Sequence, residues 1–339
     1  MRVRSLILKW KTVNQVIRYA QSPKITFEDR RLAGRFNAKL EWGIEHLKLH
    51  FPETAGSLLQ ELGDSSYSRV ETLIRHNKIY LSNVSLYHLS IVLTCMQYSE
   101  VNRVVELGGG YGGLARLFLL NSLKPVEKYY VIDLPESLFF CEVFLRANFP
   151  DKIIAYITDG GQRPNDEADI VLCPVHHLNS LDGMPFDLLI NTGSLGEMPD
   201  EYVDFYMKWL DRMPIRHFYS LNYFAMPLHN RMEGRNNYSP RPSSKWHACF
   251  LHYDPLIVSY TGCPRIWAEI LYANSDLVNV TDESYFDHWK LLQELDKLRG
   301  CETIEKTNAL LSQCRTLPVM PKEAGYLQSL LSKGSDIIQ

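Results

Sequence analysis

The chain has 339 residues, 45% of them hydrophobic and 22% charged, which excludes a disordered or fibrous protein. A net charge of −3 argues against a protein that binds nucleic acid over its whole surface. The charge is uneven, because residues 1–40 hold ten Lys or Arg and two Asp or Glu, a net +8 that leaves the rest at −11. No apolar run approaches the roughly 20 residues that span a bilayer.

The cysteines and acids give no sign of a metal centre. Seven cysteines are scattered, without a CxxC pair or a Cys/His cluster at zinc spacing. Cys95, Cys141 and Cys173 stand in apolar stretches, which is typical of reduced core thiols in a cytoplasmic protein. The aspartates between residues 159 and 187 form no recognisable ligand string. We therefore expect a cytoplasmic protein without a metal.

The first 98 residues are predicted to be mostly helical. Apolar residues recur near helical spacing over 40–51, and 84–98 has the composition of a longer buried helix. We interpret residues 1–98 as a region that caps a substrate site or joins subunits of a homo-oligomer.

After residue 100, short β-rich runs alternate with helical segments. Three helices are expected: one over LARLFLLNSL, which follows the first run and its glycines, one at 136–149 and one at 201–213. This alternation indicates βαβ units and a mostly parallel sheet covered on both faces. The six runs expected to form strands are 101–107, 128–135, 152–158, 169–174, 186–192 and 216–224.

The remaining sequence departs from this alternation. Residues 225–247 are polar and rich in Arg, Asn and Pro, which predicts a functional lid or a disordered segment. Runs at 255–260 and 268–274 are expected to be the last two strands, as an antiparallel pair. Residues 283–339 return to a helical pattern.

Together these elements predict an α/β fold with three regions. A Rossmann-like, doubly wound and mostly parallel sheet of seven strands is expected over residues 99–280. Helical additions are expected before it, at 1–98, and after it, at 281–339.

The most informative stretch is VVELGGGYGGLAR, residues 104–116. A strand, a glycine turn and a helix in this order predict a loop that binds a nucleotide cofactor. The glycines alone do not name the cofactor. Gly108, Gly110 and Gly113 match the dinucleotide pattern GxGxxG, whereas Gly108, Gly110 and Gly112 match GxGxG, the S-adenosylmethionine pattern.

Two acids narrow the choice of cofactor. Glu106 stands two residues before the first glycine, where a carboxylate would repel a pyrophosphate but attract the ammonium and sulfonium of S-adenosylmethionine, directly or through water. Asp133, at the end of the second strand, can accept hydrogen bonds from both ribose hydroxyls. That feature is shared with NAD enzymes, so it indicates a nucleoside rather than a particular one. The alternative is that both acids only cap helices.

Over residues 99–275 the chain resembles the Rossmann-like S-adenosylmethionine-dependent methyltransferases. The tracts ELGGGYGGLAR, VIDLPE and LLINTGSLGEM are similar to those of the sugar O-methyltransferase family found among surface-polysaccharide genes of bacteria. The first two tracts also resemble the plant-type small-molecule O-methyltransferases, and the third, extended as NTGSLGEMP, favours the sugar family. The resemblance implies methyl transfer from S-adenosylmethionine to a hydroxyl, with S-adenosylhomocysteine as the product.

The predicted cofactor contacts follow from this loop and resemblance. The resemblance implies that Gly108, Gly110, Gly112 and Asp133 surround the cofactor. Asn191 is expected to hold either the methionine end of the cofactor or a substrate hydroxyl, with an ordinary turn residue as the alternative. The full predicted set is Glu106, Gly108, Gly109, Gly110, Tyr111, Gly112, Asp133, Leu134 and Asn191.

Methyl transfer to an unactivated hydroxyl also needs a base. Ligands of open α/β sheets bind at the carboxyl ends of the strands, which locates the candidates. Glu197 is the first candidate for a catalytic or substrate-orienting carboxylate, and an acid that only favours a helix N-terminus is the alternative. His176, His177 and His247 are the other candidate bases. His176 or His177 could instead line the adenine pocket or have no special role.

Further polar and aromatic residues are candidates for the acceptor. Trp246 could stack on the C–H surface of a sugar, and the alternative is packing of the loop. Arg241 could grip a phosphate on a nucleotide- or lipid-linked sugar, and a solvated basic loop is the equal alternative. The predicted substrate-binding set is Ser194, Asn222, Tyr223, Arg241 and Trp246.

The sequence leaves other functions open. The acceptor could be a small phenol or secondary metabolite, the chain could be an NAD-dependent oxidoreductase, or it could be a non-catalytic methyltransferase-like scaffold. No nucleic-acid partner is expected. The basic residues 1–40 could contact anionic lipid at the membrane surface, form a solvated face or contact an acidic patch of another subunit. Contact with the acidic remainder of the same chain is favoured.

Overall fold

The computed structural model describes residues 48, 51–62, 73–76, 79–98, 100–124, 126–225, 242–252 and 266–280. It divides into two compact units, which are described separately. The first unit contains Met1–Leu93 and Arg116–Pro125, and the second contains Thr94–Ala115 and Val126–Gln339. The predicted domain boundaries after residues 98 and 280 stay predictions.

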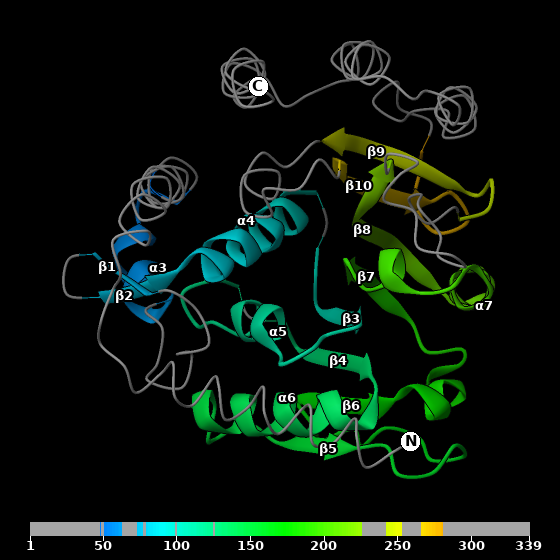
Figure 1. Ribbon diagram of the computed structural model, residues 1–339, viewed down its shortest axis with the longest axis horizontal. Coiled ribbons are helices and arrows are strands. Elements are labelled where there is room, and N and C mark those ends of the chain that lie inside the picture. Colours follow the sequence, from blue (N-terminus) through cyan, green and yellow to red (C-terminus); the bar gives the residue numbers. More distant parts are fainter. Residues whose placement is uncertain are drawn as a thin grey trace. The chain divides into compact units, whose positions relative to one another are not determined.

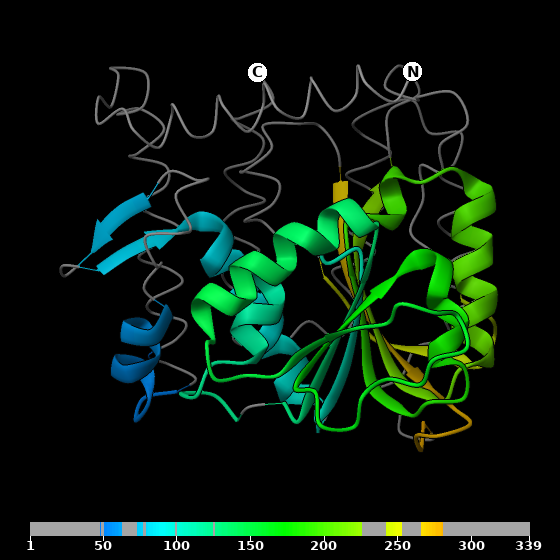
Figure 2. The same ribbon diagram turned by 90° about the horizontal axis from the view of Figure 1, so that it is seen from below.

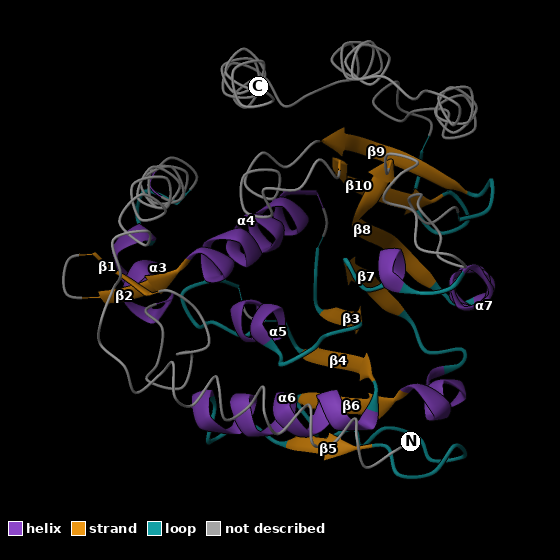
Figure 3. Ribbon diagram, viewed as in Figure 1, coloured by secondary structure: helices purple, strands orange, loops and turns teal. Residues whose placement is uncertain are grey.

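The first unit contains a β-hairpin where the sequence predicted helix. Strands β1 (Leu73–His76) and β2 (Ile79–Ser82) pair antiparallel, with His76 opposite Ile79 (Figure 3). A two-residue connection between short apolar runs is a hairpin pattern, and it overrides the helical interpretation here. Helix α4 (Asn83–Tyr98), which the boundary between the units crosses, confirms the helix predicted at 84–98.

Helix α3 (Ala55–Leu62) is held in the first unit through its C-terminus. The Arg116 guanidinium donates to the carbonyl oxygens of Glu61, at 3.0 Å, and Leu62, at 3.4 Å. These carbonyls have no partner within the helix, and a cation at this end also suits the helix dipole. The predicted helix at 40–51 lies outside the described residues except for Lys48 and Phe51, of which Lys48 is helical.

The described part of the second unit is built on an eight-stranded sheet, in the order β5-β6-β4-β3-β7-β8-β10-β9 (Figure 1). The first six strands in this order are parallel, and β10 is antiparallel to both of its neighbours. This arrangement confirms the predicted Rossmann-like α/β fold, with eight strands instead of seven. The strands are β3 (Arg103–Leu107), β4 (Lys128–Asp133), β5 (Ile154–Tyr156), β6 (Ile170–Pro174), β7 (Phe186–Thr192), β8 (Ile215–Ala225), β9 (Trp246–His252) and β10 (Ile266–Asn274).

Strand β9 corrects the prediction for the polar segment. Residues 246 and 247 were expected to end a loop, but they begin this strand, with Trp246 opposite Asn274 of β10. Trp246 and Ala248 are fully buried and His247 between them is half-buried, the alternation of a strand at a sheet surface. The run at 255–260, predicted as a strand, and the helical pattern at 283–339 lie outside the described residues.

The sheet lies between helices on its two faces (Figures 1 and 2). Helix α6 (Pro135–Asn148) buries Leu138, Cys141 and Leu145, which recur at helical spacing, on one face. Helix α7 (Asp200–Arg212) buries a stripe that includes Val203 and Trp209 on the other. Because strand side chains alternate, Val105 and Leu107 join the α7 cluster, whereas Glu106 points to the opposite face.

Three shorter helical elements complete the described part of the second unit. They are α5 (Gly113–Phe118), which the boundary between the units crosses, and the 3₁₀ turns η1 (Val175–Leu181) and η2 (Leu195–Glu197). Within the described part of the chain, no helix is long and apolar enough to cross a membrane.

Candidate functional site

The glycine loop after β3 needs glycine at three of its positions. Gly108, Gly110 and Gly112 have φ angles of 78°, 55° and 86°, in the left-handed region that side chains disfavour. The Gly108 N–H donates to the carbonyl oxygen of Ile132 at 2.7 Å, which ties the loop to the neighbouring strand β4. The turn that the sequence predicted therefore lies at the carboxyl edge of the sheet.

The surroundings of these glycines differ, and the difference indicates where a ligand can approach. A Cβ on Gly108 would collide with the Ser194 side chain, and a Cβ on Gly112 would lie 2.8 Å from the Cys141 sulfur. A Cβ on Gly110 would meet nothing within 4 Å. Gly108 and Gly112 therefore serve close packing, whereas the backbone at Gly110 borders open space.

Asp133 stands at the rim of this open space. One carboxylate oxygen accepts the Gly110 N–H at 2.7 Å, and the other accepts the Leu134 N–H at 2.6 Å. A carboxylate offers about four lone-pair sites, so each oxygen can still accept a ribose hydroxyl. Leu134 is 54% exposed and Tyr111 is 40% exposed, so apolar surface flanks the same place. These predicted cofactor contacts come together.

Glu106 lies beneath the loop, where a Cβ on Gly109 would come within 3.1 Å of its Oε2. Its side chain is 2% exposed, and its Oε2 accepts the Tyr129 hydroxyl at 2.9 Å. Burial raises the pKa of Glu106 to about 7, and the negative charge of Asp133 adds to the rise, while the Tyr129 hydrogen bond opposes it. A cation above the loop would stabilise the charged form, and an anion would oppose it. Sequence reasoning missed Tyr129, because nothing in its motif marks it as a partner of the acid.

Asn191 joins β3, β7 and β8 through hydrogen bonds that use all of its capacity. Its amide nitrogen donates to the Leu107 carbonyl at 2.8 Å and to the Ser194 hydroxyl at 2.5 Å. Its amide oxygen accepts from Asn222 Nδ2 at 2.9 Å and from the Leu195 N–H at 3.3 Å. The residue is fully buried. The structure thus brings Asn191, Ser194 and Asn222 together as predicted, but Asn191 has no donor left for a cofactor or substrate.

Glu197 ends the turn η2, which directly follows β7. Its side chain is exposed, so a ligand at this edge can reach it. The helix α7 that follows begins only at Asp200, where Asp200 and Glu201 already supply the acids of the first turn. Glu197 is therefore separate from the acids that favour the N-terminus of this helix.

His176 and His177 lie on the other side of the glycine loop. They belong to η1, which follows β6, and their ring centroids are 4.1 Å apart. In the sheet order β6 is three strands from β7, or about 14 Å at the usual strand spacing. Because Asp133 pairs with Pro174 of β6, the histidines stand near the nucleoside end of the predicted cofactor site. This position favours the adenine-pocket alternative over a base next to Glu197.

Trp246 and His247 lie near the amino ends of the parallel strands, called the amino edge below, which is opposite the edge that carries the glycine loop. This position corrects their predicted place beside the acceptor. Trp246 pairs with Asn274, whose amide donates to the carbonyl oxygen of Ile215 at the start of β8. The buried Trp246 indole donates to Asp211 Oδ1 at 2.9 Å. Tyr223 lies in β8, but its side chain is outside the description, as is all of Arg241.

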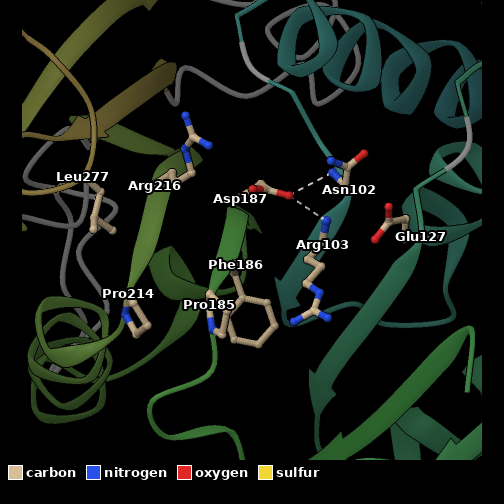
Figure 4. A pocket seen from close by; sticks show the side chains of 9 residues that line it. All are labelled: Asn102, Arg103, Glu127, Pro185, Phe186, Asp187, Pro214, Arg216 and Leu277. Atoms are coloured by element: carbon tan, nitrogen blue, oxygen red, sulfur yellow. Dashed lines mark hydrogen bonds between the residues drawn. The ribbon is translucent and has the colours of Figure 1, made fainter. Parts of the chain in front are cut away.

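A pocket of about 490 Å³ opens at this amino edge, away from the glycine loop (Figure 4). Asp187 lies at its centre, and one oxygen of its carboxylate accepts the N–H groups of Asn102, at 3.0 Å, and Arg103, at 2.9 Å. The pocket has no glycine turn, and its two acids balance its two arginines. The lining residues are Asn102, Arg103, Glu127, Pro185, Phe186, Asp187, Pro214, Arg216 and Leu277.

Two further observations concern a buried acid in β10 and the search for a metal site. Glu269 of β10 is 7% exposed and accepts the Tyr219 hydroxyl at 2.7 Å, a second buried carboxyl–phenol pair that sequence reasoning missed. The signal for it was an acid inside the apolar run AEILYAN. Among the described residues, no group of three or more His, Cys, Asp or Glu side chains could hold a metal ion.

Comparisons with known proteins found similar solved structures but no match in sequence. No family model matches the chain, and no curated protein matches its sequence. A Haemonchus contortus phosphoethanolamine N-methyltransferase, solved with phosphoethanolamine and S-adenosylhomocysteine, is 13% identical, with a TM-score of 0.38. That match covers 86% of this chain and only 57% of that enzyme.

Two further solved structures are similar over a shorter part of the chain. An arsenic(III) S-adenosylmethionine methyltransferase from Chlamydomonas reinhardtii is 12% identical over 55% of this chain and 72% of its own, with a TM-score of 0.33. An S-adenosylmethionine-dependent methyltransferase from Mesorhizobium loti is 12% identical over 55% of this chain and 96% of its own, with a TM-score of 0.33. Function is therefore inferred from the residues of the site.

Proposed function

We propose that this chain is an S-adenosylmethionine-dependent methyltransferase that acts on a sugar hydroxyl. The observation that carries the proposal is a glycine turn held between two acids. Glu106 lies beneath the turn, and Asp133 at its rim accepts the Gly110 N–H at 2.7 Å. The open space at Gly110 supplies the close approach to the backbone that a nucleoside cofactor needs.

Of the two acids, Glu106 favours S-adenosylmethionine over a dinucleotide. Asp133 suits the ribose of either cofactor, so it does not discriminate. Glu106 does, because a pyrophosphate placed on this turn would meet a buried carboxyl group in a medium of low dielectric constant. The ammonium group of S-adenosylmethionine would instead favour the ionised carboxylate. Leu134 and Tyr111 would flank the nucleoside, with the His176–His177 pair on its adenine side.

When bound, S-adenosylmethionine supplies a methyl group on a positively charged sulfur. Transfer of that methyl group to an acceptor hydroxyl would leave S-adenosylhomocysteine, with the former bond electrons on its sulfur, and a proton to be removed. The hydroxyl proton must then leave. We assign its removal to the carboxylate of Glu197, which is exposed and close in sequence to the end of β7. A general base of this kind contributes about 10²–10⁴ in rate.

The choice of a sugar rests on the resemblance of the NTGSLGEMP tract, which contains Ser194 and Glu197. Carboxylates and hydroxyls are the groups that bind polyols by hydrogen bonding. Methylation of catechols and not of sugars would instead indicate a phenolic acceptor.

Calorimetry with S-adenosylhomocysteine tests the cofactor assignment. Gly110→Arg should abolish binding, because the side chain would fill the open space beside Asp133. Gly183→Arg is the matched control, since Gly183 also has a positive φ, of 75°, and open space around its Cβ position. Wild-type affinity in Gly110→Arg, or no binding by the wild type, would contradict the proposal. Fluorescence titration with NADH tests the oxidoreductase alternative in the same protein.

Transfer of labelled methyl from S-adenosylmethionine tests the acceptor. The panel comprises free hexoses and deoxyhexoses, a nucleotide-linked sugar and a catechol. Label in the sugars, and its loss in Glu197→Gln, is the expected result. Label in the catechol alone would replace the sugar assignment by the phenolic one. Cofactor binding without transfer to any acceptor of the panel would favour the non-catalytic scaffold.

A further inference from the structure

We infer that Asn222 is a positioning residue that fixes the Glu197 turn relative to the glycine loop, acting with Asn191 and Ser194. These three side chains are called the amide network below. The inference rests on the proposed function, because it assigns to Glu197 the task of taking the hydroxyl proton.

The turn that carries Glu197 is held through four of the five backbone N–H groups from Gly193 to Glu197. The Gly193 N–H donates to the Leu221 carbonyl at 2.8 Å, and the Glu197 N–H donates to the Ser194 carbonyl at 3.1 Å. Between them, Leu195 N–H donates to Asn191 Oδ1, at 3.3 Å, and Gly196 N–H donates to Asn222 Oδ1, at 3.0 Å. The backbone just before an exposed carboxylate is thus fixed by buried side chains from β7 and β8.

The same network also holds the start of the glycine loop. The Leu107 carbonyl, immediately before Gly108, accepts from Asn191 Nδ2 at 2.8 Å and from Ser194 Oγ at 3.2 Å. Ser194 also packs so tightly on Gly108 that a Cβ there would collide with it. The cofactor turn and the Glu197 turn are therefore tied to each other through two hydrogen bonds to the Leu107 carbonyl.

Asn222 completes the network from β8. Its Nδ2 donates to Asn191 Oδ1 and to Ser220 Oγ, both at 2.9 Å, so it orients Asn191 while its own oxygen holds Gly196. Asn191, Asn222 and Ser220 are all fully buried. Burying two amides is unfavourable unless they are paired, and packing alone would be served by apolar residues. In-line methyl transfer needs both turns in fixed positions, and misplacing a reacting group by about 1 Å can reduce the rate about 10²-fold.

Hydrogen exchange measured by mass spectrometry tests the structural half of the inference without any substrate. In Asn222→Ala, exchange should rise in the peptide that contains Leu195, Gly196 and Glu197. It should stay unchanged there in Asn274→Ala, the matched control, in which an equally buried asparagine at the amino edge is truncated. Unchanged exchange in Asn222→Ala, with the protein folded, would overturn the inference.

A double-mutant cycle with Glu197→Gln tests the functional half, using the acceptor from the panel that becomes labelled. Asn222→Ala should lower kcat about 10²-fold, with the affinity for S-adenosylhomocysteine within about twofold of wild type. In the Glu197→Gln background the same change should lower kcat by less than about twofold. Ser194→Ala serves as a second variant in case Asn222→Ala does not fold. It removes only the hydroxyl hydrogen bonds of a half-buried residue, so it should show the same pattern with a smaller loss of kcat.

Equal losses in both backgrounds would overturn the positioning role and leave the proposed function intact. Failure of the wild type to bind S-adenosylhomocysteine would instead overturn the proposed function itself. The two failures are therefore distinguishable in one set of proteins.

Discussion

The two edges of the sheet in the second unit use similar residues for different purposes. At the carboxyl edge, Asp133 accepts one N–H from each of two residues and stands beside open space at Gly110. At the amino edge, Asp187 accepts two N–H groups on one oxygen and joins the starts of β3 and β7. Among the described residues, only the first edge has a turn with three positive-φ glycines and an acid that accepts one of its backbone N–H groups. The presence of a pocket therefore indicates function less well than the backbone geometry around it.

The largest expected effect separates these two aspartates. Asp133→Asn should weaken binding of S-adenosylhomocysteine about 10- to 100-fold, because hydrogen bonds to a charged group contribute about 1.5–3 kcal/mol. The measurement is calorimetry at fixed salt and pH. Asp187→Asn is the matched change at the amino edge and should leave the affinity within about twofold.

Asp187→Asn should instead lower the stability of the fold. Its carboxylate accepts two backbone N–H groups, and an amide in its place keeps one weaker acceptor for them. We expect a loss of about 1–3 kcal/mol in the free energy of unfolding, measured with urea. If Asp187→Asn weakened binding of S-adenosylhomocysteine and Asp133→Asn did not, the assignment of the cofactor site to the carboxyl edge would be wrong.

A second comparison concerns the pH dependence of binding. Burial raises the pKa of Glu106 to about 7, so the carboxyl is largely protonated below pH 7 and ionised above it. An ammonium group above the loop favours the ionised form, so affinity for S-adenosylhomocysteine should rise between about pH 6 and pH 8. Glu106→Gln should remove this rise, since the amide does not titrate. Glu269→Gln, which alters the other buried carboxyl–phenol pair, is the control and should retain it.

The stability of the free protein should change with pH in the opposite sense. A carboxyl with a raised pKa binds its proton more tightly in the folded state, so the folded state holds more protons between the ordinary carboxyl pKa and about 7. Stability from this group is thus lost as the pH rises through that window. Urea denaturation of wild type and Glu106→Gln at pH 6 and pH 8 measures the difference. A wild type that gained stability relative to the variant on going to pH 8 would contradict the assignment.

The sequence predicts the elements around the glycine loop well, because their signals are local. Alternating apolar runs mark the strands, and three glycines that need positive φ mark the turn. The role of Asn191 was less predictable, since its hydrogen bonds reach residues 84 positions before it and 31 positions after it. The position of Trp246 was predicted wrongly because it, too, depends on contacts between residues that are distant in the sequence. A short strand antiparallel to β10 carries it to the far edge, and only the pairing register reveals that.

The smallest expected effect is that of the arginines at the amino edge. Arg103 and Arg216 line the pocket of about 490 Å³, and neither guanidinium has an ion-pair partner within the described part of the chain (Figure 4). Arg216→Ala and the double Arg103→Ala/Arg216→Ala variant should bind S-adenosylhomocysteine within about twofold of wild type, because cofactor contacts are assigned to the other edge. Methyl transfer should likewise be retained. A tenfold weakening, about 1.4 kcal/mol, would place part of the cofactor or acceptor in this pocket, and a functional site confined to the carboxyl edge would then be wrong.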